Sequence, residues 1–376
     1  MKAQEDFYYD EVFKEYKSRG DIQDYARDKL GKGAFGIVKE VKYKNKLCAG
    51  KLIVKESLGE TEYSEDLKGP NIIKIYKICS PVIKFGNTYQ LIIMEKAILN
   101  DLGKLNMFFH QKNLLRLIFK NAFNKELSDS LLRFYTKQLI NGFAILYKNN
   151  FVHFDIKPEN ILITNNLTLK LSDFSVLQKV VEPLSKIPGG TVGYLSPEYY
   201  KKKETSPDDA RKQDYFALGS TLFYLKYGDK LLNYKKDESN DIIMNKIVEE
   251  LMRDSNYLYS RKSNDRHFII FLNHLLHINP DYRYDFREIF MNKWVNTNLD
   301  SIEKVADIFE NDEEMFLMEL QKLDFILQKK KIFKGIDDDE DDDSSDDEKS
   351  NNKSNSEKKK KKINRKKFRF KKKIED

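Results

Sequence analysis

Residues 153–162 read HFDIKPENIL, and DFS follows at 173–175. These two motifs bring together four polar side chains that differ in chemistry: Asp155, Lys157, Asn160 and Asp173. Transfer of a γ-phosphoryl group requires a carboxylate that orients the acceptor hydroxyl and takes its proton, a cation on the phosphate in transit, and oxygen ligands for Mg²⁺. Asp155 can supply the first function, Lys157 the second, and Asn160 with Asp173 the third. The motifs therefore predict a phosphoryl-transfer site rather than a loop of polar residues that cap neighbouring helices.

A glycine-rich segment, LGKGAFGIV, occupies residues 30–38 upstream of these motifs. Its G-x-G-x-x-G spacing occurs both in dinucleotide-binding turns and in hairpins that cover phosphates. A dinucleotide-binding turn leads into a helix, whereas IVKEVKY (37–43) continues as a strand. The segment therefore predicts a hairpin lid whose glycines let backbone N–H groups approach phosphates, with Phe35 at its tip.

Lys51 lies thirteen residues beyond Val38, at the end of a short apolar stretch that begins at Cys48. In isolation such a lysine is typical of a solvated strand end. Because a phosphate-binding lid precedes it and the 153–175 motifs follow it, Lys51 becomes a candidate for contact with the α- and β-phosphates of a nucleotide.

Hydrophobic periodicity divides the chain into a β-rich part and a helical part. Between residues 25 and 96, runs rich in β-branched residues predict strands: GIVKEV, LIV, NIIKIYKI and YQLIIM. From residue 128 onward apolar positions recur every three or four residues, which predicts a buried helix. Further helices are predicted at 214–227, 240–253, 265–277 and 285–293. The pattern predicts an α+β fold with a small β-rich N-lobe, a larger helical C-lobe and a cleft between them.

The predicted domain spans residues 22–297, with the N-lobe over 22–96 and the C-lobe over 97–297. Residues 1–21 form a polar lead-in with interleaved aromatic side chains, for which a helix and an irregular structure are both open. Residues 298–336 predict a helical extension, because apolar side chains again recur at helical spacing.

Residues 337–376 sort their charges into two blocks. DDDEDDDSSDDE (337–348) contains ten acidic residues, and KKKKKINRKKFRFKKK (358–373) is strongly basic. Neither block has enough apolar side chains to offset chain entropy, so we expect a disordered tail. The basic block is suited to RNA, an anionic membrane or a nuclear import receptor, and it could equally pair with the acidic block.

Composition excludes several classes of protein. The 376 residues carry a net charge of +7, too little by itself to argue for nucleic-acid binding. Two cysteines, Cys48 and Cys79, exclude a disulfide scaffold and fit a reducing compartment. The first ten residues are too charged for a signal peptide, and no apolar run approaches the roughly 18 residues of a membrane span. We expect a soluble protein, cytoplasmic or nuclear, without a transmembrane segment.

Three later motifs complete an ordered series: GTVGYLSPE (190–198), DYFALG (214–219) and PDYR (280–283). With the glycine-rich loop, Lys51, HFDIKPEN and DFS, they make residues 25–297 resemble a eukaryotic protein kinase. Lys157 and Thr191 are similar to the serine/threonine branch, where they help to place the acceptor hydroxyl. The resemblance implies transfer of the γ-phosphoryl group of ATP to serine or threonine hydroxyls of protein substrates. It also implies that Glu198 pairs with Arg283 and that Asp214 steadies the catalytic loop.

The resemblance assigns further roles at the cofactor site. The catalytic residues would be Asp155, Lys157 and Lys51, and the Mg²⁺ ligands Asn160 and Asp173. Met94 would be the gatekeeper, Glu95 to Ala97 would bind adenine through backbone groups, and four apolar side chains would sandwich the base: Leu30, Val38, Ala49 and Leu162. The full set expected to contact ATP is Leu30, Gly31, Lys32, Gly33, Ala34, Phe35, Gly36, Ile37, Val38, Ala49, Lys51, Met94, Glu95, Ala97 and Leu162.

Two departures from the kinase pattern concern single residues. Phe154 makes the motif HFD in place of HRD, and the missing arginine is the one that normally binds a phosphorylated activation-loop residue. We therefore expect activity that does not require phosphorylation between Asp173 and Glu198, where Ser185 is the foremost candidate hydroxyl. Ser175 makes the second motif DFS in place of DFG, and a serine should make flipping of this loop harder.

The third departure is a shortened segment. Only 18 residues separate Lys51 from Pro70, and the missing length falls on the helix that supplies the glutamate partner of the lysine. Glu60 is the best candidate for that partner and Glu62 the second, although either could be a solvated surface charge. The alternative function is therefore a pseudokinase, a nucleotide-binding scaffold or interaction module without efficient transfer.

Overall fold

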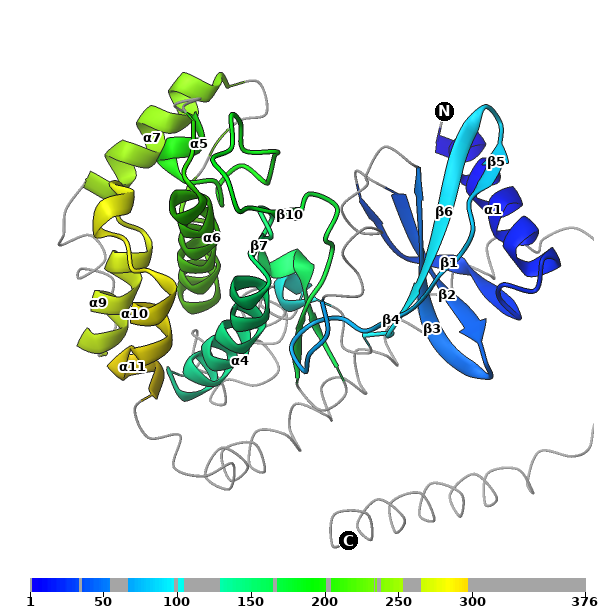
Figure 1. Ribbon diagram of the computed structural model, residues 1–376, viewed down its shortest axis with the longest axis horizontal. Coiled ribbons are helices and arrows are strands. Elements are labelled where there is room, and N and C mark those ends of the chain that lie inside the picture. The colour runs from blue at the N-terminus through cyan, green and yellow to red at the C-terminus, as the bar shows by residue number, and fades with distance from the viewer. Residues whose placement is uncertain are drawn as a thin grey trace, which may run out of the picture. The chain divides into compact units, whose positions relative to one another are not determined.

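A β-rich lobe is followed along the chain by a helical lobe, which confirms the predicted α+β class and two-lobed architecture (Figure 1). The computed structural model describes ten stretches of the chain: residues 2–33, 36–54, 67–97, 101–104, 129–164, 168–200, 204–232, 234, 238–252 and 265–296. Four sets of expectations lie outside these residues: Ala34 and Phe35 of the glycine-rich loop, the glutamates Glu60 and Glu62, the extension at 298–336, and the charged tail at 337–376.

The N-lobe is built on a six-stranded antiparallel sheet in the order β1-β2-β3-β6-β4, with β5 paired to β6. Its strands are β1 (Asp24–Gly33), β2 (Gly36–Tyr43), β3 (Lys46–Val54), β4 (Ile75–Ile78), β5 (Val82–Lys84) and β6 (Asn87–Met94). Tight turns join neighbouring strands where the backbone adopts positive φ. Lys44 and Asn45 have φ of 47° and 62° between β2 and β3, and Phe85 and Gly86 have φ of 52° and 77° between β5 and β6. The predicted strands GIVKEV, LIV and YQLIIM lie within β2, β3 and β6.

The predicted strand NIIKIYKI is only half correct. Its second half is β4, but its first half leaves the sheet and joins the C-lobe. Ile72 bridges Leu171, Ile73 N–H donates to the Leu171 carbonyl over 2.9 Å, and Leu171 N–H donates to the Asn71 carbonyl over 2.9 Å. The β-branched composition therefore indicated extended backbone correctly, but could not indicate which strand it would pair with.

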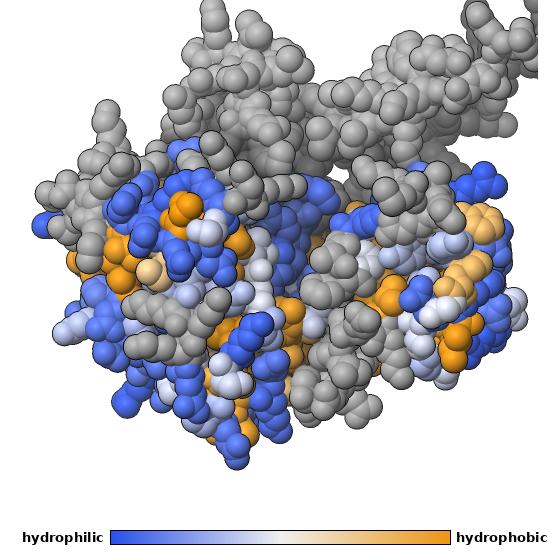
Figure 2. Space-filling view, turned by 90° about the horizontal axis from the view of Figure 1, so that it is seen from above, coloured by the Kyte–Doolittle hydropathy of each residue, from blue (hydrophilic) through white to orange (hydrophobic). Residues whose placement is uncertain are grey.

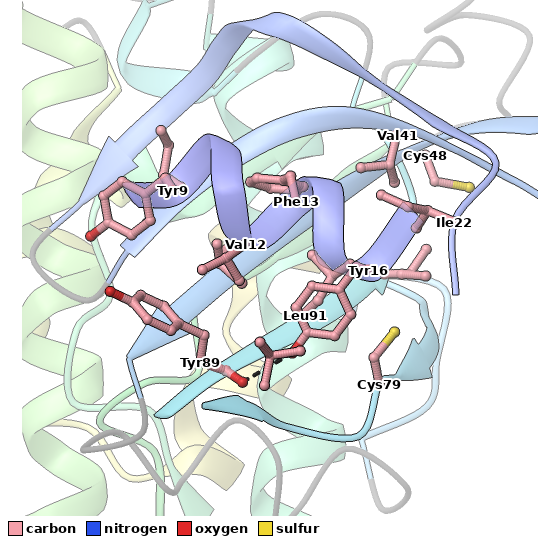
Figure 3. Close-up of a cluster of buried hydrophobic side chains, with 14 residues drawn as sticks. Tyr9, Val12, Phe13, Tyr16, Ile22, Val41, Cys48, Cys79, Tyr89 and Leu91 are labelled. Carbon is pink, nitrogen blue, oxygen red and sulfur yellow. Dashed lines mark hydrogen bonds between the residues drawn. The ribbon is translucent and has the colours of Figure 1, made fainter. Parts of the chain in front are cut away.

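The first segment of the chain is a helix, α1 (Lys2–Ser18), which packs on the sheet (Figure 3). Val12, Phe13 and Tyr16 are fully buried there, and the Tyr16 hydroxyl donates to the Tyr89 carbonyl over 2.9 Å. Their spacing of one, three and four residues places them on one helical face. Of the two alternatives for the lead-in, the structure shows the helix, and it shares a hydrophobic core with the strands.

The C-lobe contains the helices α4 (Asp129–Lys148), α5 (Pro197–Tyr200), α6 (Pro207–Tyr227), α7 (Asn240–Met252), α9 (Arg266–Leu275), α10 (Phe286–Met291) and α11 (Lys293–Asn296), with 3₁₀ turns η1 (Pro158–Asn160) and η2 (Pro280–Tyr282). Four short strands accompany them: β7 (Phe151–Val152), β8 (Ile161–Ile163), β9 (Leu169–Leu171) and β10 (Gln178–Lys179). Each helix predicted between residues 128 and 293 is present. Helix α6 begins earlier than predicted because Ser206 caps it, accepting from Asp209 N–H, with a proline in the first turn.

On the coloured part of the face seen in Figure 2, hydrophilic side chains predominate, with groups of hydrophobic side chains among them. Exposed large hydrophobic residues include Phe7, Ile83 and Met291, which belong to three different elements. In the part of the chain that the structure describes, no helix combines the length and apolar character needed to cross a membrane.

Candidate active site

Asp214 of the buried helix α6 holds the loop between β7 and η1. One carboxylate oxygen accepts from His153 N–H over 2.7 Å, and the other accepts from Phe154 N–H over 2.8 Å. Phe154 has a φ of 64°, a conformation that a bulky residue adopts only when its surroundings enforce it. Burial raises the pKa of Asp214 to about 7, while the two N–H donors act in the opposite direction. The role implied for Asp214, support of this loop, agrees with its contacts.

His153 is fully buried, and its contacts define its tautomer. Its Nδ1 accepts from Asp155 N–H over 3.3 Å, so the proton must lie on Nε2, which donates to the Ser172 carbonyl over 3.1 Å. Burial lowers the pKa of His153, which favours this neutral form. The imidazole therefore ties the Asp155 loop to the residue before Asp173, rather than acting as an acid or base.

Asp155 stands at the centre of a closed polar network. Lys157 Nζ and Asn160 Nδ2 donate to Asp155 Oδ2 over 2.6 and 2.9 Å, and Thr191 Oγ1 donates to Oδ1 over 2.6 Å. Lys157 Nζ also donates to Thr191 Oγ1 over 2.8 Å. Because both carboxylate oxygens have partners, the orientation of Asp155 is fixed, and Lys157 places a positive charge beside it.

Asp173 lies across from this network and pairs with Lys51 of β3. Lys51 Nζ and Ser175 Oγ both donate to Asp173 Oδ1 over 2.8 Å. Burial acts to raise the pKa of Asp173, but the charge and hydrogen bond of Lys51, helped by Ser175, outweigh it and lower the pKa to about 2. Asp173 is therefore ionised at neutral pH, and its backbone adopts a φ of 63°.

Asn160 and Asp173 are suited to hold Mg²⁺. Asn160 Nδ2 donates to the Asp155 carbonyl and carboxylate, which turns the amide oxygen away from them. Ser172 N–H and Oγ donate to the Asn160 carbonyl over 3.0 and 2.9 Å, so the two candidate ligands are tied together. Among the residues that the structure describes, no cluster of three histidine, cysteine or carboxylate side chains could hold a metal alone. Mg²⁺ in nucleotide sites needs no such cluster, because phosphates and water complete its shell.

One face of the N-lobe sheet, called here the cleft face, carries several residues of the predicted nucleotide site. Val38 pairs with Lys51 across β2 and β3, and Ala49 pairs with Met94 across β3 and β6. Ala49 and Lys51 are two residues apart on one strand, so they share a face. Glu95 N–H donates to the Lys74 carbonyl over 2.8 Å, which fixes the segment that leads to Ala97. Leu30 on β1 and Leu162 on β8 lie on opposite lobes.

Residues 25–295 match the protein kinase domain family. The chain belongs to the protein kinase family. Aurora kinase of Eremothecium gossypii is 26% identical over 284 residues, which cover 72% of this chain and 68% of the relative. Aurora kinase of Saccharomyces cerevisiae is 29% identical over 292 residues, with the same shares of 72% and 68%. A probable cAMP-dependent protein kinase catalytic subunit of Encephalitozoon cuniculi is 30% identical over 233 residues, or 61% of this chain and 67% of the relative. Protein kinases use ATP and Mg²⁺ and act on protein substrates.

Two residues expected to contact ATP in this kinase turn their side chains elsewhere. Ile37 is fully buried in the hydrophobic core that the sheet shares with α1, and the Lys32 ammonium lies 6.0 Å from the centre of the Tyr9 ring of α1. Side chains alternate between the two faces of a strand, so a run of consecutive contacts cannot all face the cleft. Only backbone groups of Ile37 could meet a phosphate. Gly36 is different: a Cβ there would come within 2.0 Å of the Leu52 carbonyl oxygen, so only glycine fits.

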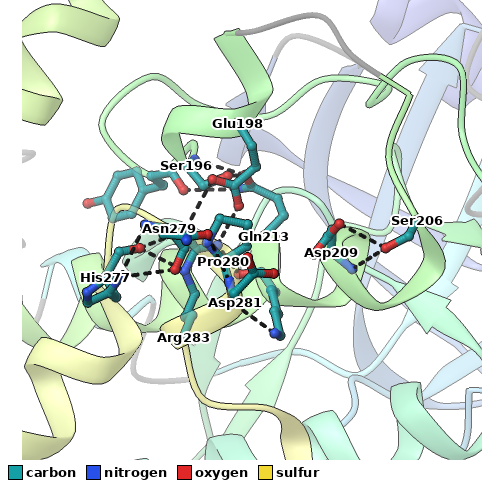
Figure 4. Close-up of polar contacts among 12 residues, drawn as sticks. Ser196, Glu198, Ser206, Asp209, Gln213, His277, Asn279, Pro280, Asp281 and Arg283 are labelled. Carbon is teal, nitrogen blue, oxygen red and sulfur yellow. Dashed lines mark hydrogen bonds and ion pairs between the residues drawn. The ribbon is translucent and has the colours of Figure 1, made fainter.

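The segment that contains Ser196 and Glu198, where a kinase would bind its peptide substrate, forms hydrogen bonds with α6 and with the residue that follows η2 (Figure 4). Arg283, 1% exposed, donates to Glu198 Oε2 over 3.1 Å and to the His277 carbonyl over 2.9 Å, which is the pair that the resemblance implied. Gln213 adds an attachment that sequence reasoning missed, since its Oε1 accepts from Ser196 N–H and Oγ over 2.8 and 2.6 Å. A lone glutamine carries no sequence signal for such a role.

Asp101 is a second residue that sequence reasoning missed. It is 8% exposed, bridges Leu162, and accepts from Lys104 N–H over 2.8 Å. The bridge places the backbone of Asp101 beside Leu162, a residue expected to contact the base, while its carboxylate caps the turn that leads to Lys104. Nothing in its sequence neighbourhood distinguishes it from a surface aspartate.

Proposed function

We propose that this chain is an active serine/threonine protein kinase that transfers the γ-phosphoryl group of ATP to protein hydroxyls. The observation that carries the proposal is the closed network of Asp155, Lys157, Asn160 and Thr191, with Lys51 bonded to Asp173 in the same structure. A scaffold that only bound partners would not need every one of these contacts to form together.

The chemistry that we assign to the network is that of the protein kinase family, and the contacts of the network support it. Asp155 orients the acceptor hydroxyl and takes its proton as the bond between oxygen and the γ-phosphorus forms. The bond from that phosphorus to the bridging oxygen breaks, and ADP leaves with the electron pair. Lys157 neutralises charge on the phosphoryl group in transit, and Lys51 contacts the α- and β-phosphates. Asn160 and Asp173 would hold Mg²⁺, which when bound supplies positive charge beside the phosphates.

Thr191 favours a serine or threonine acceptor. Its hydroxyl accepts from Lys157 and donates to Asp155, so an aliphatic hydroxyl already sits within bonding distance of both groups. A serine or threonine of a substrate presents the same chemistry at the same reach. A tyrosine hydroxyl lies further from its own backbone and would require a deeper peptide platform.

The test is transfer of radiolabelled γ-phosphate from Mg-ATP to a mixed peptide library, followed by identification of the phosphorylated amino acid. The wild-type chain should label serine or threonine peptides, whereas Asp155→Asn should not. Asp241→Asn, an exposed residue in the first turn of α7, is the matched control and should label as the wild type does. Mg²⁺-dependent nucleotide binding without any transfer by the wild type would support the pseudokinase instead.

Phe154 supports a second part of the proposal, activity without phosphorylation of the activation segment. Its side chain is 1% exposed and lies in a hydrophobic cluster with Val152, Val180, Ile187 and Ala210. Val180 and Ile187 belong to the segment between Asp173 and Glu198, so apolar packing holds that segment where an arginine would otherwise need a phosphate partner. Full activity after treatment with a phosphatase is the expected result, and an essential phosphorylated Ser185 would contradict it.

The proposal for the tail rests on its sequence alone. We propose that the basic block 358–373 binds polyanions such as RNA and that the acidic block 337–348 masks it. A chain without residues 337–348 should bind RNA more tightly than the whole chain, and equal affinity would remove the idea. Vesicles containing anionic lipids and a nuclear import receptor, titrated in the same way, test the other two partners.

A further inference from the structure

Ser175 occupies the position where the kinase family has glycine, and its backbone accepts the change without strain. Asp173, two residues earlier, has positive φ, as do five other non-glycine residues of the described chain, but Ser175 is not among them. A side chain at position 175 is therefore compatible with the loop as it stands. What remains to be explained is what the hydroxyl does.

The hydroxyl is directed at the candidate metal ligand. Ser175 is 7% exposed, and its Oγ donates to Asp173 Oδ1 over 2.8 Å. Lys51 Nζ donates to the same oxygen over 2.8 Å. With both donors on Oδ1, rotation of the carboxylate is restricted and Oδ2 is left to face a cation.

The two hydrogen bonds to Asp173 Oδ1 respond differently to a shift of one lobe relative to the other. Lys51 lies on β3 of the N-lobe, at the end of a flexible stem, and it is 122 residues from Asp173 in the chain. Ser175 is two residues from Asp173 and moves with the same loop. A shift of the N-lobe can therefore lengthen the lysine contact while the serine contact persists.

We propose that Ser175 is a positioning residue that holds the Asp173 carboxylate in the orientation required for Mg²⁺. This rests on the proposed function, in which Asp173 is a Mg²⁺ ligand. Groups that hydrogen-bond a ligand carboxylate commonly contribute 10- to 100-fold to metal affinity. Because Lys51 holds the same oxygen, we expect the effect of Ser175 to lie near the lower limit, about tenfold.

The experiment measures the binding of ADP by calorimetry, once with excess Mg²⁺ and once with EDTA, in the full-length chain. The ratio of the two affinities reports how strongly the metal supports the nucleotide, and it requires no transfer. In Ser175→Ala this ratio should fall about tenfold toward one, which corresponds to about 1.4 kcal/mol. The affinity in EDTA should stay at the wild-type value, because the hydroxyl acts on the metal ligand and not on the nucleotide.

Two further variants separate positioning from a merely structural role. Ser175→Thr keeps the hydroxyl and should restore the ratio, whereas Ser175→Gly restores the family residue but removes the donor, so it should behave like Ser175→Ala. An unchanged ratio in Ser175→Ala, or a wild-type ratio in Ser175→Gly, would overturn the proposal. Thermal unfolding of each variant shows whether the comparison is between folded proteins.

Asp173→Asn distinguishes failure of this inference from failure of the proposed function. If Asp173→Asn removes the effect of Mg²⁺ and Ser175→Ala does not change it, the metal site stands and only the role of Ser175 is wrong. If Asp173→Asn leaves the effect of Mg²⁺ intact, Asp173 is not a ligand, and the inference fails together with the assignment on which it rests.

Discussion

Replacement of Phe154 by alanine should destabilise the kinase and release its activation segment. The ring is 1% exposed and packs against residues of β7, α6 and the segment at 176–187, with Val176, Leu184 and Tyr199 at the edge of the cluster. Removal of a phenylalanine ring from such a site costs about 3–5 kcal/mol, the sum of lost burial and of the cavity left behind. Phe154→Leu leaves most of that volume filled and should cost less. Phe7→Ala, at a residue 55% exposed, is the matched control and should change stability by no more than about 0.5 kcal/mol.

Urea unfolding measures the change in stability, and hydrogen exchange locates it. The amides of Val180 and Leu184 donate to the carbonyls of Asn150 and Thr205 over 2.7 and 2.8 Å, so they report directly on the segment. Both should exchange slowly in the wild type after phosphatase treatment and faster in Phe154→Ala. A loss of stability below about 1 kcal/mol, or fast exchange in the dephosphorylated wild type, would refute the idea that apolar packing replaces a phosphate contact.

Three other perturbations test separate parts of the structure. Lys39 is 2% exposed and pairs with the half-exposed Asp10 of α1, so Asp10→Ala leaves a buried charge and should lower the free energy of unfolding in urea by about 3–5 kcal/mol. Lys39→Met should lower it much less, because water can hydrate Asp10. Equal losses in the two variants would contradict this asymmetry. Arg283→Met should lower the free energy of unfolding by a similar amount, about 3–5 kcal/mol, and should lower transfer activity, because Glu198 loses its buried partner. A stable, fully active variant would show that the ion pair is dispensable. The pKa of Asp173 is about 2 in the folded chain against an ordinary 3.8, so the stability that this carboxylate contributes is present above about pH 4 and is lost as the pH falls toward 2. Asp173→Asn should flatten that part of the curve of unfolding free energy against pH. An unchanged slope would show that another group titrates there.

The catalytic half of the site was predictable because its residues are close in sequence. The motif at 153–162 and Asp173 lie on one short loop and the hairpin that follows, so the spacing in the chain nearly fixes the spacing in space. The contact of Lys51 with Asp173 joins two lobes; the resemblance placed both residues at the nucleotide site, but the partner it implied for the lysine was a glutamate. Gln213 bonds Ser196 and Tyr194, and the backbone of Asp101 bridges Leu162; these are long-range contacts, for which a sequence offers no periodic signal.

The predicted strand and side-chain positions that differ from the structure do so for one physical reason: local sequence does not determine which element a segment packs against. Ile72 was expected to pair within the N-lobe sheet, but it bridges Leu171 of β9 in the other lobe. Ile37 and Lys32 lie in the glycine-rich hairpin as predicted, yet strand alternation and the packing of α1 turn their side chains away from the cleft. The interleaved aromatic residues of the lead-in left a helix and an irregular structure both open, and the burial of Val12, Phe13 and Tyr16 in α1 depends on the sheet on which they pack.

Asp155 is the residue on which phosphoryl transfer is proposed to depend most directly. The most direct measurement is the rate of transfer from Mg-ATP to the best library peptide by the wild type and by Asp155→Asn, with ADP affinity measured in parallel. We predict a loss of about 10²- to 10⁴-fold in rate with unchanged ADP affinity, because the carboxylate acts on the acceptor hydroxyl and not on the nucleotide. Equal rates in the two proteins, or no transfer by a wild-type chain that binds Mg-ADP, would contradict this proposal.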